Sequence, residues 1–105
     1  PIIKPLGRTR PCLPAWHHYV ARIDFEAAGI SRAQLMRAMA ADGIGTQVHY
    51  FPVHRQPYYA KLYETPRLTG ADRYYEHALS LPLFASMTDG DIARVTASLA
   101  CRLGF

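Results

Sequence analysis

The chain has 105 residues, 50% of them hydrophobic and 19% charged, which is typical of one globular domain with a modest core. The formal net charge is +4 and the arginines are scattered, so nucleic-acid binding has only weak support. Cys12 and Cys101 are too few and too far apart for a disulfide framework or a zinc knuckle, and they favour a reducing, cytoplasmic setting. No stretch is long and apolar enough to predict a signal peptide or a membrane span.

The first 15 residues include Pro5, Pro11 and Pro14 and have no apolar periodicity. This pattern predicts an extended lead-in over residues 1–15, and we expect it to connect to a domain upstream.

The next elements are predicted from alternation, caps and breakers. Residues 18–25 alternate apolar and polar side chains, which predicts a half-buried strand. Ser31 is a plausible N-cap for a helix of roughly three turns, and Gly43 is well placed to end it. Residues 44–51 again predict a strand, which Pro52 ends.

Two short helices are expected in the second half of the chain. Pro57 suits the first turn of a helix that reaches Leu62, because a proline lacks the N–H that would be unsatisfied there. A loop is expected over residues 64–70. Asp72 is the expected N-cap of a helix that reaches Leu79.

The chain is predicted to close with an extended segment and a long helix. Residues 80–84 form an apolar run interrupted by proline, which favours an edge strand or an extended segment. Thr88 and Asp91 form a candidate capping box for the terminal helix. Its apolar stripe comprises Ile92, Val95, Leu99 and Leu103. The order of elements predicts an α+β fold, a small antiparallel or mixed sheet of about three strands covered by helices on one face.

The stretch GIGTQVHYFPVHRQPYY, residues 43–59, concentrates hydrogen-bonding and aromatic side chains almost without charge. His49 and His54 would point to opposite faces of a strand, and no Cys or carboxylate stands nearby, so no metal site is expected. There is no nucleophile elbow, phosphate loop or carboxylate pair. Taken singly, His49 and Tyr50 are equally well explained as sheet residues, and His54 and Gln56 as loop residues. Taken together, these side chains favour a ligand-binding surface.

This stretch resembles the small C-terminal domain of the DegT/DnrJ/EryC1/StrS family of pyridoxal-phosphate sugar aminotransferases. Within the family it is most similar to enzymes that aminate the C4 keto group of UDP-linked 4-keto-6-deoxy sugars on the pseudaminic acid route. Three other stretches agree in order, namely HYV at 18–20, YYEHALSLPLF at 74–84 and MTDGDIARV at 87–95. The resemblance covers residues 14–100 and implies that residues 16–105 form that small domain.

The resemblance also implies an upstream large domain that holds pyridoxal phosphate as a Schiff base on a lysine. Lys4 and Lys61 are the lysines of this chain, and neither matches the family's lysine motif, so we expect the fragment alone to be inactive. The implied reaction moves an amino group, from glutamate, to a nucleotide-linked keto sugar for cell-surface glycan synthesis. A homodimer is implied as well.

The site residues that the resemblance implies are Gln47, His49, Tyr50 and His54, which are expected to contact the nucleotide sugar. Two other functions stay open on the residues alone. One is a stand-alone module that binds a nucleotide sugar or a partner protein without catalysis. The other is a small RNA-binding domain, for which the sequence shows no basic face.

Overall fold

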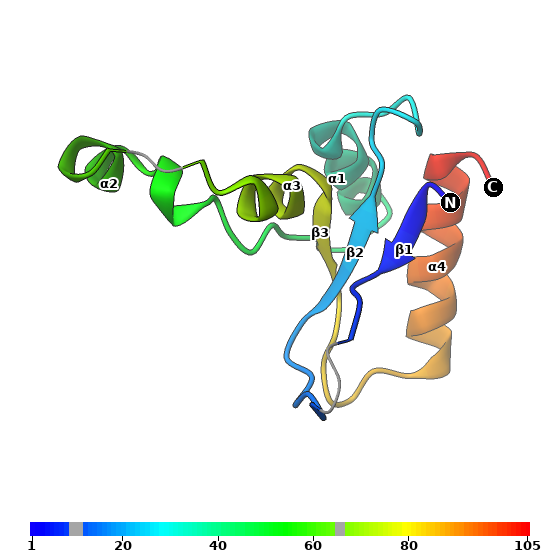
Figure 1. Ribbon diagram of the computed structural model, residues 1–105. Helices are drawn as coiled ribbons and strands as arrows, with labels where there is room; N and C mark the ends of the chain where they lie inside the picture. The colour runs from blue at the N-terminus through cyan, green and yellow to red at the C-terminus, as the bar shows by residue number, and fades with distance from the viewer. Residues whose placement is uncertain (9–11, 65–66) are drawn as a thin grey trace.

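The computed structural model describes residues 1–8, 12–64 and 67–105. These ranges contain three strands, four α-helices and one 3-10 helix, and Figure 1 shows how the labelled elements are arranged. In chain order they are β1 (Ile3–Pro5), β2 (Tyr19–Ile23), α1 (Arg32–Ala41), η1 (Val53–Arg55), α2 (Pro57–Leu62), α3 (Thr69–His77), β3 (Ala78–Leu81) and α4 (Asp89–Leu103). The predicted α+β class is confirmed.

The sheet is antiparallel, with β2 between β1 and β3. Ala21 is the residue of β2 that pairs with Pro5 on one side and with Leu79 on the other. Because successive side chains of a strand point to opposite faces, Ala21 and Ile23 share one face, and both are buried there.

Helices α1 and α4 cover this buried face. Leu35 and Met39 of α1 pack with Ile23 and Leu79 of the sheet in one cluster, and each of these four side chains is 0% exposed. Full burial of such a side chain contributes about 1.5–3 kcal/mol. The core therefore lies between the sheet and the two helices, and Leu99 from α4 closes it.

The two long helices begin where local sequence predicts. Ser31 caps α1, where its side chain accepts a hydrogen bond from the Gln34 N–H while the Gln34 side-chain oxygen accepts one from the Ser31 N–H. Thr88 and Asp91 form the same reciprocal box at α4. Such boxes satisfy backbone donors that the first helical turn would otherwise leave unpaired.

A polar link joins the end of α1 to α4. Ser98 donates to the Asp42 carboxylate over 2.7 Å, and Arg102 donates over 2.9 Å. The backbone then turns at Gly43, whose φ is +75°, so the predicted C-terminal glycine is confirmed. A Cβ at this position would lie 2.7 Å from the Arg94 guanidinium, which itself donates to the Asp42 carbonyl.

Three local expectations differ from the structure. Residues 44–51 do not form a strand, because Gln47 alone makes a bridge, with Ser80 of β3. Asp72 does not cap α3, which begins at Thr69 and ends at His77, so it does not reach the expected Leu79, which lies in β3. The expected lead-in over residues 1–15 contributes the short edge strand β1.

Residues 50–64 form an arm that projects from the sheet (Figure 1). No residue of η1 or α2 is buried, and the tyrosines Tyr50, Tyr58 and Tyr63 are 71%, 68% and 65% exposed. The radius of gyration is 15.5 Å, compared with about 13 Å for a compact domain of this length. The arm is therefore the part of the described chain that departs most from globular packing.

Candidate functional site

Three of the four predicted site residues lie together beyond the outer edge of β3. The Gln47 N–H and carbonyl exchange hydrogen bonds with the backbone of Ser80 over 3.1 and 2.8 Å. His49 follows, with its Nδ1 2.8 Å from the Ser80 hydroxyl. The Tyr50 ring stands edge-on to the His49 ring, with 4.7 Å between centroids. Ser80 thus positions this segment through both its backbone and its side chain.

The fourth predicted residue, His54, lies at the base of the arm. Its Nε2 is 3.2 Å from the Asp72 carboxylate, and its side chain is only 9% exposed. Arg55 reaches the same carboxylate at 3.6 Å. These contacts hold η1 against α3, so the structure gives His54 an anchoring position and does not bring it beside His49.

A stack of arginine and aromatic side chains reinforces this junction. The Arg32 guanidinium lies 4.5 Å from the centre of the Tyr75 ring and donates to the carbonyl of Tyr75. The Phe51 ring meets Tyr75 edge-on at 5.5 Å, and Arg55 lies 5.4 Å from the Phe51 ring. Cation–π contacts of this kind contribute about 0.5–1 kcal/mol at exposed sites. They connect α1 and α3 to the first residues of the arm.

His49 belongs to a small pocket of about 230 Å³ that we call the histidine pocket, which is lined by polar side chains and by Leu81, Pro82 and Leu83. Its polar lining consists of His17, His18, Thr46, Gln47, His49 and Ser80. The ring centroids of His17 and His18 are 4.0 Å apart, and those of His18 and His49 are 4.1 Å apart. Sequence reasoning did not assign His17 and His18 to the site, although HYV at 18–20 stands in one of the matching stretches.

Two ionisable groups around the pocket have shifted pKa values. The pKa of His18 is lowered because partial burial disfavours its charged form, and because charges on His17 and His49 would repel it. Burial raises the pKa of Tyr74, whose hydroxyl donates to the His49 carbonyl over 3.4 Å. Among the described residues, no group of three or more His, Cys, Asp or Glu has the arrangement of a metal site.

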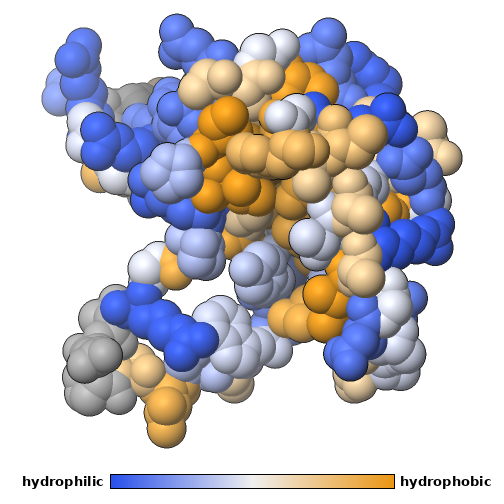
Figure 2. All heavy atoms as spheres, turned by 90° about the vertical axis from the view of Figure 1, so that its right-hand side faces the viewer, coloured by the Kyte–Doolittle hydropathy of each residue, from blue (hydrophilic) through white to orange (hydrophobic). Residues whose placement is uncertain are grey.

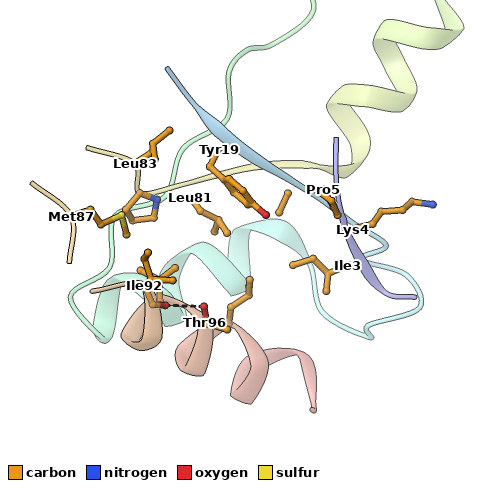
Figure 3. Close-up of a pocket in the computed structure, with 13 residues that line it drawn as sticks. Ile3, Lys4, Pro5, Tyr19, Leu81, Leu83, Met87, Ile92 and Thr96 are labelled. Atoms are coloured by element: carbon orange, nitrogen blue, oxygen red, sulfur yellow. Dashed lines mark hydrogen bonds between the residues drawn. The ribbon is translucent and has the colours of Figure 1, made fainter. Parts of the chain in front are cut away.

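A larger apolar groove of about 450 Å³ lies between the sheet and the first half of α4 (Figure 3). Tyr19, Leu81, Met87 and Ile92 line it, and Ile92 is 51% exposed although it belongs to the predicted apolar stripe. Figure 2 shows apolar side chains gathered on this side of the molecule, among hydrophilic ones. The groove offers a packing surface and lacks converging polar groups.

The two lysines of this chain lie outside the histidine pocket. Lys4 lines the apolar groove and Lys61 lies in α2 of the arm, and neither is among the residues that line the histidine pocket. No helix in the described part of the chain has both the length and the apolar character needed to cross a membrane.

Comparison with known proteins gives a family match. The model of the DegT/DnrJ/EryC1/StrS aminotransferase family matches residues 5–100. The curated spore coat polysaccharide biosynthesis protein SpsC from Bacillus subtilis (strain 168) is 43% identical over 81 residues, which are 74% of this chain and 21% of that protein.

Solved structures share the fold. The DesV structure from S. venezuelae, solved in complex with a ketimine intermediate, has a TM-score of 0.82 and 28% identity over all of this chain and 27% of its own. The Helicobacter pylori PseC structure, an aminotransferase of pseudoaminic acid biosynthesis, has a TM-score of 0.75 and 23% identity over 83% of this chain and 23% of its own. The chain thus spans about a fifth of its curated relative and about a quarter of these two solved chains.

Proposed function

This chain belongs to the DegT/DnrJ/EryC1/StrS aminotransferase family, and from that membership we propose that it is the C-terminal small domain of a pyridoxal-phosphate-dependent sugar aminotransferase. In this proposal residues 16–105 form the small domain, and residues 1–15 lead in from a large domain that carries the Schiff-base lysine. The cofactor supplies the electron sink, and this chain contributes binding and orientation.

The proposed substrate is a nucleotide-linked keto sugar, and the proposed amino donor is glutamate. The product would enter polysaccharide synthesis in the cytoplasm, and the full protein would be a homodimer. Support comes from the name of SpsC, a polysaccharide biosynthesis protein, and from the DesV complex with a ketimine. This chain covers about a fifth of SpsC, which is consistent with our proposal that it does not catalyse the reaction on its own.

The observation that carries the site assignment is the double attachment of the 47–50 segment to Ser80. Backbone bonds fix Gln47, and the Ser80 hydroxyl fixes the ring of His49. A side chain held in this way meets a ligand without first losing rotamer freedom, which favours binding. We assign the substrate contact to Gln47, His49 and Tyr50, and His54 supports it by anchoring the arm to α3.

The test uses the full-length protein. Absorbance in the Schiff-base band on addition of pyridoxal phosphate reports the cofactor. We expect His49→Ala to reduce turnover of the nucleotide sugar by about tenfold or more, the range of a lost charge-assisted contact. His77→Ala is the matched control, because the half-buried His77 ring bonds the Arg73 carbonyl of its own helix and is not among the residues that line the histidine pocket.

A second variant separates contact from positioning. In His49→Asn the side-chain amide can take the place of Nδ1 and keep a bond to Ser80, with its oxygen as the acceptor where the Ser80 hydroxyl donates, while the Nε2 side of the ring is lost. If His49 contacts the substrate, both His49 variants lose turnover. Unchanged kinetics in His49→Ala, with a native circular dichroism spectrum, would contradict the assignment. If no Schiff-base band forms in the full-length protein, the stand-alone binding module becomes the better explanation.

A further inference from the structure

The histidine pocket gathers imidazoles without a carboxylate to balance them. His17, His18 and His49 line it together with the neutral side chains of Thr46 and Gln47, and no Asp or Glu is among its lining residues. A carboxylate beside a histidine is the usual way to stabilise its charged form. None of the lining residues can stabilise the charged imidazoles in this way, which leaves that role to a bound anion.

The charge of the stack depends on what occupies the pocket. With neighbouring ring centroids 4.0 and 4.1 Å apart, one protonated imidazole makes a second proton unfavourable. Partial burial, together with this repulsion, lowers the pKa of His18. Tyr50 and Tyr74 also lie near the stack, and both are phenols that supply no carboxylate to it. A bound anion would remove the repulsion and draw protons onto the rings.

The hydrogen-bonding groups also suit an anion. The Ser80 backbone is fully paired with Gln47, and its hydroxyl bonds Nδ1 of His49. When the hydroxyl donates, the His49 proton sits on Nε2, which can donate to a ligand. The hydroxyl of Thr46 offers a further donor at the pocket wall.

The size of the pocket restricts the ligand. Its volume of about 230 Å³ is below the roughly 300–1,000 Å³ of sites that enclose a drug-sized molecule. It can accept a compact charged group while the rest of a larger ligand extends outside.

We propose that the histidine pocket is an oxyanion site that takes a phosphate or pyrophosphate group by sharing protons among His17, His18 and His49. Two sources have this chemistry, a free inorganic anion and the pyrophosphate of a nucleotide-linked sugar. The second source rests on the proposed function, whereas the oxyanion site itself does not.

Isothermal titration of the full-length protein tests the proposal, with pyridoxal phosphate present throughout so that a cofactor site elsewhere stays filled. The probes are inorganic pyrophosphate and UDP. We expect His18→Ala and His49→Ala to weaken pyrophosphate binding about tenfold or more, as expected for loss of a charge-assisted hydrogen bond. His77→Ala, which removes a histidine outside the pocket, should leave it unchanged. His18→Gln replaces His18→Ala if the latter does not fold.

Sulfate serves as the probe of protonation, because its own charge is constant between about pH 6 and pH 8. We expect sulfate to bind about tenfold more weakly at the higher pH, with proton uptake on binding seen as a dependence of the heat on buffer. A sulfate affinity that does not change with pH would overturn the proposal, as would equal pyrophosphate affinities in the wild type and the pocket variants. If the variants weaken pyrophosphate binding but not UDP binding, the site stands and the nucleotide source is wrong.

Discussion

The core and the arm of this chain are built from similar residues that are used in opposite ways. Ile23, Leu35 and Leu79 disappear from solvent between the sheet and its two helices. In the arm, Tyr58 and Leu62 are 68% and 54% exposed, and α2 buries no residue. The arm is held mainly at its base, where His54 and Arg55 meet Asp72.

This difference separates residues that stabilise the fold from residues that leave apolar surface in solvent within one small domain. A buried leucine contributes through area removed from water, whereas an exposed aromatic side chain leaves that free energy for a later contact. The apolar groove beside α4 (Figure 3) is a second surface of this kind. Residues with similar hydropathy therefore contribute differently to stability, according to the element in which they lie.

The largest expected effect on stability comes from a comparison of two leucines, one in the core and one in the arm. We predict that Leu79→Ala lowers the free energy of unfolding by about 2–5 kcal/mol, because it leaves a cavity in the centre of the core. Leu62→Ala removes the same atoms from the arm and should cost no more than about 0.5 kcal/mol. Urea denaturation of both variants provides the measurement. Equal losses in the two variants would contradict the division into core and arm.

A smaller effect is expected at the junction between the two regions. Asp72→Ala removes the partner of the nearly buried His54 side chain, and a lost polar partner costs about 1–3 kcal/mol. The loss should appear as faster amide hydrogen exchange in residues 53–62, with little change in the core. Glu76→Ala is the control, since Glu76 is an exposed acid on the same helix. Faster exchange in the core instead would show that arm and core unfold together.

The smallest expected effect on stability concerns the polar link between Asp42 and α4. Hydrogen bonds from Ser98 and then Arg102 lower the pKa of Asp42, so its contribution is present above the unfolded-state pKa of 3.8. This stabilisation is lost as the pH falls through the folded-state pKa of Asp42, which lies below 3.8. We predict that Asp42→Asn is less stable than the wild type at about pH 7 and that the difference narrows at about pH 3. A difference that stays constant with pH would mean that the carboxylate charge plays no part.

Sequence predicted the features that depend on neighbouring residues. The N-cap at Ser31, the capping box at Thr88 and the proline that opens α2 each need only a few residues in register, and all are confirmed. The family resemblance, which draws on ordered motifs, is confirmed as well. The predicted site roles and the domain boundary at residues 15–16 stay predictions.

The features that sequence did not predict depend on distant partners. Val48 and Phe51 favour a strand locally, yet this segment finds only one bridge, at Gln47. Asp72 suits an N-cap by residue type, but the partners it meets are His54 and Arg55. The histidine pocket likewise needs His17 and His18, the 45–49 segment and residues 80–83 to come together, and no local pattern specifies that contact.

The two edges of the sheet, β1 and β3, are both protected against pairing with a strand of another copy of the chain. An open strand edge can template pairing with another molecule, which is a route to aggregation. On one margin β1 has three residues and ends at Pro5, which has no N–H to donate. On the other margin, Gln47 already occupies the backbone groups of Ser80. Gln47, the first residue of the proposed substrate contact, therefore also blocks the addition of another strand at Ser80.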